Sequence, residues 1–216
     1  MEGAASGLVR GIAQGLWLVP LAFLGCSKPS ESVPVVAPLS AEIRAAAVER
    51  GKGIVAETFS LLSSNLQSAI EQGGVSNALP YCSLAASPLT SGMADKHGVT
   101  IRRVTHKARN PADRADAVEL AILKQFEATL HGVAATHPPP MATNLNAHTV
   151  SFFAPIVLNK ELCLKCHGQP GKDIATENMD VIQRLYPQDE ATGFKLGDLR
   201  GAWRIDFSLA TLTQGN

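Results

Sequence analysis

The sequence predicts an α+β fold in which a small antiparallel sheet is flanked by helices and follows one long N-terminal helix. Three observations predict it. Apolar residues recur at three- to four-residue spacing over residues 41–72, which is the period of an amphipathic helix. Short alternating and β-branched runs follow later in the chain, and helical segments separate them. Helices first, then strands interleaved with helices, is the pattern of an α+β domain.

The N-terminal part of the domain is predicted to be helical. The first helix covers residues 41–72 and ends at Gly73 and Gly74. At about 1.5 Å per residue it would be about 45–50 Å long, which is more than a compact domain needs. We therefore expect it to project or to pair with a second copy of the chain. A second helix covers residues 75–86, and residues 89–97 form a short helical turn.

The second half of the chain alternates strands with helices. We expect strands at 99–105 and 148–158, and a turn followed by a strand at 197–209, with Trp203, Ile205 and Phe207 alternating on one of its faces. We expect helices at 115–130, 161–167 and 173–186. A turn at 107–113 and a Pro-rich loop at 137–141 connect them.

The first 27 residues resemble a bacterial lipoprotein signal. Residues 11–25 form an apolar run that is too short and too broken for a good membrane span, and Gly25 directly precedes Cys26. By that resemblance, cleavage precedes Cys26, whose acyl chains then anchor the protein stably. Ser27 resembles the signal that sends lipoproteins to the outer membrane. The alternative is an ordinary secretory signal that happens to contain a cysteine.

This division predicts three parts: a signal peptide at 1–25, a Pro/Ser-rich tether at 26–39, and a cofactor-binding domain at 40–212. One domain of ordinary size remains after cleavage. The chain carries 19 basic and 19 acidic residues, so its formal net charge is zero. That balance gives no indication of a nucleic acid or a strongly charged partner.

The most informative motif is the run Cys163-Leu164-Lys165-Cys166-His167. In an exported protein a C-x-x-C-H run is typical of c-type haem attachment, in which both thiols become thioethers to one macrocycle. His167 would then supply the proximal imidazole to the iron. The alternatives are a redox dithiol, which would need a βαβ context, and half of a zinc site, which would need a second Cys/His pair.

The four cysteines leave one thiol without an assignment. Cys26 is assigned to lipid, and Cys163 and Cys166 are assigned to haem, so Cys82 remains in a compartment that oxidises thiols. A lone thiol there is either buried and inert, joined to another molecule by a disulfide, or bound to iron as a thiolate.

Several blocks of sequence occur together in a fixed order: ALPYCSLA, TIRRVTHKARNPAD, VSFFAPIVLNKELCLKCHG and YPQDEATGFKLGDLRGAWRI. Together they resemble a family of small single-haem c-type proteins formerly described only as a domain of unknown function. The resemblance covers roughly residues 40–209. It implies a PAS-like, sensor-type fold and a haem with histidine and cysteine as axial ligands, which by position are His167 and Cys82.

Two further sets of residues are candidates for the site. The best rival iron ligands are His148 and Met141; weaker ones are Met93, Met179, His97 and His106. Arg102, Arg103 and Arg109, with Lys107, form a basic cluster from which one or two residues would contact the anionic haem propionates. The alternative for Arg109 is that, with Asn110, it only fixes a turn.

Three classes of function remain open. The fold resemblance and a displaceable thiolate favour a redox or small-gas (NO/CO) sensor, which would need a separate signalling partner because the sequence carries no output segment. A lipid-anchored haem protein facing the periplasm from the outer membrane also suits electron transfer with a redox partner protein. A haem enzyme such as a peroxidase would need a distal acid/base pair, and the sequence shows none. We therefore expect no enzyme.

Overall fold

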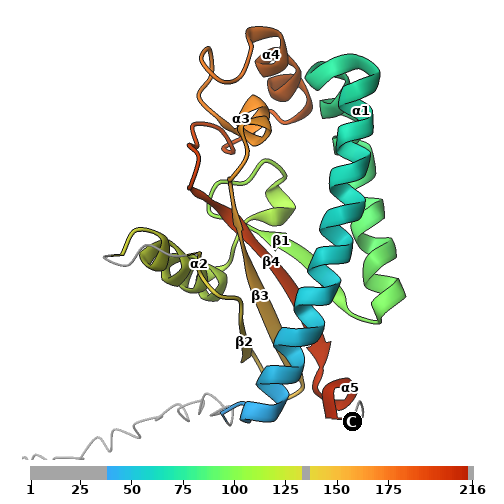
Figure 1. The fold of residues 1–216 in the computed structure, drawn as a ribbon, viewed down its shortest axis with the longest axis vertical. Helices are drawn as coiled ribbons and strands as arrows, with labels where there is room; N and C mark the ends of the chain where they lie inside the picture. The colour runs from blue at the N-terminus through green and yellow to red at the C-terminus, as the bar shows by residue number, and fades with distance from the viewer. Residues whose placement is uncertain (1–37, 133–136, 214–216) are drawn as a thin grey trace, which may run out of the picture. The chain divides into compact units, whose positions relative to one another are not determined.

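The structure is a computed structural model that describes residues 38–132 and 137–213 (Figure 1). The predicted signal peptide at 1–25, Cys26 and most of the predicted tether lie outside the described residues. The elements in chain order are α1 (Ala41–His97), β1 (Thr100–Val104), the 3-10 turn η1 (Pro111–Asp113), α2 (Ala117–Leu130), β2 (Met141–Asn144), β3 (Thr149–Val157), α3 (Glu161–His167), α4 (Thr176–Leu185), β4 (Leu199–Ser208) and α5 (Leu209–Thr213).

α1 is a helical hairpin rather than one rod. Gly73 and Gly74 have non-helical backbone angles, and Gly74 has φ 73° and ψ −171°, a conformation that in practice only glycine adopts. The N-terminal limb (residues 41–72) and the C-terminal limb (residues 75–97) therefore run antiparallel, side by side (Figure 1). The hydroxyl of Tyr81 donates to Asn65 Oδ1 across the hairpin at 2.8 Å. The predicted end of the first helix at the glycine pair is confirmed.

The predicted break between residues 86 and 89 is wrong, because the C-terminal limb continues through Pro80 and Pro88 to His97. Each proline removes one backbone hydrogen bond from the helix, which sequence reasoning treats as a boundary. Packing of the limb against neighbouring elements outweighs this local penalty. Near its start, Ser76 donates to Asn178 of α4 at 2.6 Å, and near its end Met93 is buried in the core.

The four strands form one antiparallel sheet in the order β1-β4-β3-β2. The predicted strands at 99–105, 148–158 and 197–209 are β1, β3 and β4, so the predicted α+β class is confirmed. The short strand β2 was missed: the predicted Pro-rich loop at 137–141 overlaps its first residue. Four residues are too few to show an alternating pattern, and β2 pairs only with β3, at an edge of the sheet.

Helices cover both faces of the sheet (Figure 1). Trp203, Ile205 and Phe207 lie on the face that packs against α1, as their alternation predicts. The neighbours Phe152 and Phe153 separate, because successive strand residues point to opposite faces: Phe152 joins the α1 core and Phe153 packs with α2. Within the described residues, no helix is long and apolar enough to cross a membrane.

The contact between α1 and the sheet predicts that alanine at two neighbouring glycines changes the free energy of unfolding in opposite directions. A Cβ at Gly51 would overlap the ring of Phe152, whereas a Cβ at Gly53 would meet nothing within 4 Å. We expect Gly51→Ala to lower the free energy of unfolding by about 1–3 kcal/mol through overpacking. Gly53→Ala should raise it by up to about 1 kcal/mol, because alanine favours the helix. Urea unfolding followed by circular dichroism measures both, and equal effects would contradict this packing.

Candidate cofactor site around the C-x-x-C-H helix

α3 presents the motif at the end of the sheet where β3 finishes (Figure 1). Cys163 and Cys166 are three residues apart in this helix and so lie on one face. Both are free thiols and both are half-buried. Cys163 packs against a cluster that includes Leu164 and Phe194, and Cys166 packs against a cluster that includes Ile174. The two thiols are thus unpaired and held within one turn of helix.

A backbone carbonyl fixes the tautomer of His167. Nδ1 of the ring lies 2.8 Å from the Ala191 carbonyl oxygen. That oxygen only accepts, so Nδ1 carries the proton and Nε2 keeps its lone pair. Phe194 stands edge-on to the ring, with 6.4 Å between centroids. Burial lowers the pKa of His167 well below its usual value, and the charges of Arg200 and Arg109 lower it further. The imidazole is therefore neutral, which is the form that binds a metal.

A buried arginine ties α3 to the loop that carries Ala191. Arg109 Nε donates to Asp189 Oδ1 at 2.9 Å, and its Nη2 donates to the Cys166 carbonyl oxygen at 2.7 Å. Asp189 Oδ1 also accepts from the Ala191 backbone N–H at 3.1 Å. The side chains of Arg109 and Asp189 are only 12% and 4% exposed. This set of bonds, called here the Arg109 clamp, sets the position of the carbonyl that orients His167.

The structure brings Cys82 close to the motif from a distant part of the sequence. Cys82 lies half-buried on the C-terminal limb of α1. Burial raises the pKa of its thiol, while the positive charges of Arg103 and Arg109 lower it. Burial also raises the pKa of Cys166 to about 11, and the charge of Cys82 adds to that rise. The two thiols are therefore electrostatic neighbours, although they lie 84 positions apart in the chain.

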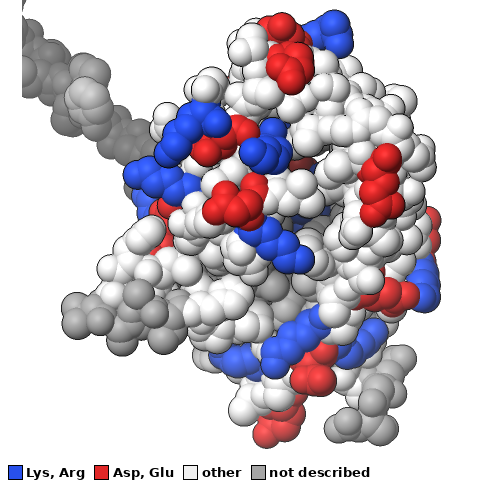
Figure 2. Space-filling model, turned by 45° about the horizontal axis from the view of Figure 1, so that its top comes forward, with Lys and Arg blue, Asp and Glu red and all other residues white. Residues whose placement is uncertain are grey.

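The predicted arginines divide between the two faces of β1. Arg102 donates to the buried Glu119 at 3.3 Å on the α2 face. Arg103 lies 3.7 Å from Asp113, and its charge acts on both Cys82 and His167. The structure thus brings Arg103 and Arg109 to the cysteines and does not bring Arg102 there. Figure 2 turns the end with α3 and α4 forward and shows a hollow in which basic side chains are set back from the surface.

Sequence reasoning missed Arg200, which acts on His167 more strongly than any other charged residue. Its Nη1 donates to Thr105 Oγ1 at 2.9 Å and to the Lys107 carbonyl oxygen at 3.1 Å. Burial lowers its pKa to about 10. The available signal was an arginine near the start of the strand predicted within 197–209, a strand with one apolar face.

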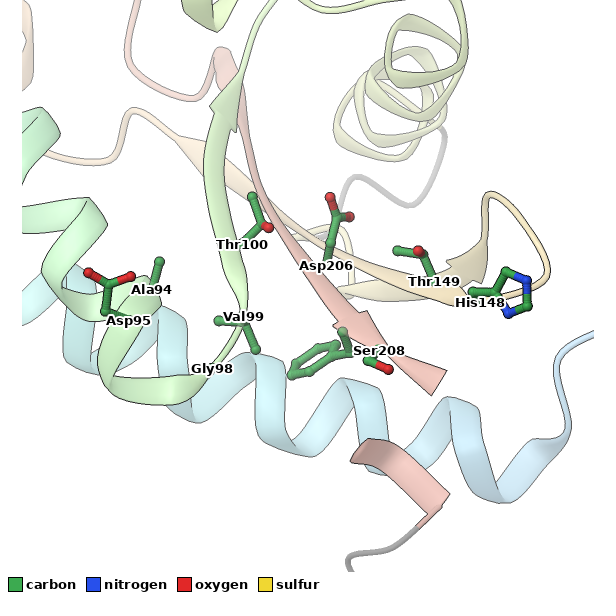
Figure 3. Close-up of a pocket in the computed structure, with 10 residues that line it drawn as sticks. Ala94, Asp95, Gly98, Val99, Thr100, His148, Thr149, Asp206 and Ser208 are labelled. Carbon is green, nitrogen blue, oxygen red and sulfur yellow. The ribbon is translucent and has the colours of Figure 1, made fainter. Parts of the chain in front are cut away.

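The rival ligand His148 lies far from His167. His148 directly precedes β3, and α3, which carries His167, follows that strand. The nine residues of β3, at about 3.3 Å each, therefore separate His148 from His167 by about 30 Å. His148 lines a groove of about 630 Å³ at the opposite end of the sheet. Figure 3 shows His148 and Thr149 on one side of this groove and Ala94 and Asp95 on the other.

The other rivals are distributed around the domain. Met141 pairs with Phe153 at the sheet edge, Met93 is buried in the α1 core, and His97 contacts Glu57. His106 stands edge-on to Phe194. Met179 alone among them packs in the same cluster as Cys166. A metal ion held by protein ligands alone needs at least three His, Cys, Asp or Glu side chains close together. Within residues 38–132 and 137–213 there is no such group, so no second Cys/His pair of a zinc site is found there.

Comparisons with known proteins point to one family. A family model described as Tll0287-like matches residues 40–208. The fold is also similar to a solved structure titled "Crystal structure of the cyanobacterial heme-protein Tll0287". The two are 25% identical, the match covers 74% of this chain and 96% of that chain, and the TM-score is 0.53. No curated protein matches the sequence.

The Arg109 clamp predicts a large contribution to stability from one ion pair. Arg109→Gln should lower the free energy of unfolding by about 3 kcal/mol, because it leaves the buried Asp189 without its partner. Arg114→Gln is the matched control, since Arg114 forms an ion pair of the same 2.9 Å length with Glu190 at the exposed surface. We expect no resolvable change there. Urea unfolding at pH 7 measures both, and a small effect at Arg109 would contradict the clamp.

Proposed function

This chain belongs to the Tll0287-like family of haem proteins, and from that membership we propose that it binds one covalent c-type haem and serves as a redox or small-gas sensor. One observation carries the proposal: α3 places two free thiols on one helix face next to an imidazole whose Nδ1 is committed to the Ala191 carbonyl. Haem held there would supply a one-electron iron couple and an axial position for a small ligand.

The residues of α3 have separate roles in binding the haem. Cys163 and Cys166 would hold the haem covalently, each thiol adding its S–H across one vinyl double bond of the porphyrin to form a thioether. His167 offers Nε2 to the iron, and its bond to Ala191 prevents the ring from rotating. The Arg109 clamp holds that carbonyl in place. These residues match the donor set of a c-type haem, with two free thiols and an imidazole whose Nε2 is left to bind iron.

Cys82 is the proposed second axial ligand. Its thiol is an electrostatic neighbour of Cys166, and both feel the charge of Arg109. Burial raises the pKa of the Cys82 thiol, and the charges of Arg103 and Arg109 oppose that rise and so favour a thiolate. A thiolate donates strongly to iron and lowers the reduction potential below that of a His/Met centre. The position of Cys82 favours it over His148 as the second ligand, because His148 lies at the other end of β3.

The position of Cys82 on α1 favours the sensor over the electron carrier. The same hairpin that carries Cys82 packs on the sheet through Ala47 and Ile54 and on α4 through Ser76 and Leu79. Release of the sulfur would remove a bond between the haem and the longest element of the domain. An electron carrier gains nothing from such a coupling, whereas a sensor needs a bistable element. The PAS-like character of the fold remains part of this proposal.

Export, lipidation of Cys26 and an outer-membrane location facing the periplasm are proposals that rest on residues 1–27. A homodimer through α1 finds support in two large apolar side chains of that helix, since Phe59 is 53% exposed and Leu84 is 77% exposed. A separate signalling partner would complete a sensor, and a redox partner protein would complete an electron carrier.

Covalent attachment is the first test of the proposed function. Haem in the wild-type holoprotein should stay with the polypeptide in acidified acetone, and the double variant Cys163→Ala/Cys166→Ala should release it, because no thioether bond remains. Cys82→Ala is the matched control and should keep its haem attached. Extractable haem in the wild type would rule out the c-type proposal.

Absorption and EPR spectra of the ferric holoprotein test the second ligand. With Cys82 bound, the iron should be low-spin with a sulfur-to-iron charge-transfer band. Cys82→Ala should abolish the band, raise the reduction potential and admit CO more readily, because a strong anionic donor has been removed. Met179→Leu and His148→Ala are the controls for the rival ligands and should leave the spectrum unchanged.

The behaviour of the ferrous wild-type holoprotein distinguishes a sensor from an electron carrier. Rapid binding of NO or CO to the ferrous form, with loss of the sulfur bond, is the result expected of a sensor. A ferrous form that keeps six ligands and exchanges electrons rapidly with another cytochrome would instead favour electron transfer.

A further inference from the structure

Arg200 is a partly buried cation that forms no ion pair in the described part of the chain. Its Nη1 is used by two neutral acceptors, Thr105 Oγ1 and the Lys107 carbonyl oxygen. Its Nε is buried and has no hydrogen-bond partner, and none is found for Nη2. A buried charge is costly unless a counter-ion or hydrogen bonds compensate it. The Nε–Nη2 edge of this guanidinium therefore lacks a ligand.

The neighbouring arginine shows what that edge binds in this protein. Arg109 presents its Nε and Nη2 to the two carboxylate oxygens of Asp189, at 2.9 and 3.3 Å. This is the side-on bidentate geometry that arginine forms with carboxylates. Arg200 holds the same edge open, but the described residues place no carboxylate against it. A carboxylate from outside the protein chain would complete it in the same way.

The charges around Arg200 do not balance. Arg103, Arg109 and Arg200 act on one another, and the two carboxylates among them are Asp113 and Asp189. Asp189 is engaged by Arg109, and Asp113 lies 3.7 Å from Arg103. Neither carboxylate is hydrogen-bonded to Arg200, so an added anion would pair with a guanidinium that has no carboxylate partner among the described residues.

Arg200 lies next to the proximal histidine. Its guanidinium carbon is 5.5 Å from the centroid of the Phe194 ring, and that ring stands edge-on to His167 at 6.4 Å. A cavity of about 220 Å³ is lined by Phe194 together with Lys107 and His106, and Arg200 is not part of its lining. Arg200 is therefore connected to the α3 site through the Phe194 ring.

We propose that Arg200 binds a propionate carboxylate of the haem side-on, through Nε and Nη2. The inference rests on the proposed function and adds a residue to it, because propionates are the anions that a haem at α3 brings into a site with excess positive charge. Arg200 would then take the role that the sequence suggested for Arg102, whose guanidinium is instead committed to Glu119 on the opposite face of the sheet.

Reversible binding of haem and of haem dimethyl ester to the full-length Cys163→Ala/Cys166→Ala chain tests this proposal. The ester lacks the propionate charges and is otherwise the same ligand. Adding Arg200→Gln should weaken haem binding about tenfold or more, as expected for a charge-assisted hydrogen bond, and should leave ester binding nearly unchanged. Arg102→Gln is the matched control and should change neither affinity.

The outcomes separate this inference from the function on which it rests. If the chain binds neither ligand and wild-type protein carries no haem, the proposed function fails. If haem binds, and Arg200→Gln lowers the affinities for haem and for its ester by the same factor or leaves both unchanged, only the propionate assignment is overturned. Should Arg200→Gln fail to fold by circular dichroism, Arg200→Lys replaces it. Lysine keeps the charge but loses the two-nitrogen edge, so the preference for haem over its ester should still fall, and an unchanged preference would overturn the assignment.

Discussion

The site depends on one hydrogen bond, from His167 Nδ1 to the Ala191 carbonyl oxygen, and on the contacts that hold this oxygen in place. α3 is only seven residues long and has no side-chain cap, so it cannot fix the ring by itself. The loop before β4 does so: Phe194 N–H donates to the His167 carbonyl at 2.9 Å, and the Arg109 clamp secures the loop from the side of η1. A neutral imidazole with a committed Nδ1 is the consequence.

The second constraint is the fold-back of α1. A straight helix would have carried Cys82 away from the sheet, and the backbone of Gly74 reverses the chain instead. The C-terminal limb then packs against α4 through Leu79, in the cluster that also contains Cys166. One glycine conformation thus brings a thiol from the first half of the chain to a motif in the second half.

The sequence predicted those features that are encoded locally. The bounds of α3 agree with the predicted 161–167, and β3 lies within the predicted 148–158, because a C-x-x-C-H run and a β-branched run each carry their own signal. The features it could not predict arise from distant pairings. Arg109 meets Asp189 across 80 positions of the chain, and no pattern indicates that pair. The opposite directions of Arg102 and Arg103 follow from strand alternation, but which of the two faces the motif depends on how the helices cover the sheet.

Charge explains why this end of the domain suits an anionic cofactor. Glu119 and Asp206 neutralise Arg102 and Arg204 on the α2 face, where the sheet forms a closed network of ion pairs. Near His167, the positive charges of Arg103, Arg109 and Arg200 act on one another and on the carboxylates of Asp113 and Asp189. If nothing bound there, an apolar residue in place of Arg200 would stabilise the protein, because burying a charge without a counter-ion is unfavourable. An anionic ligand next to His167 would pair with this guanidinium. The positive charge and the committed imidazole are therefore both suited to an anionic haem.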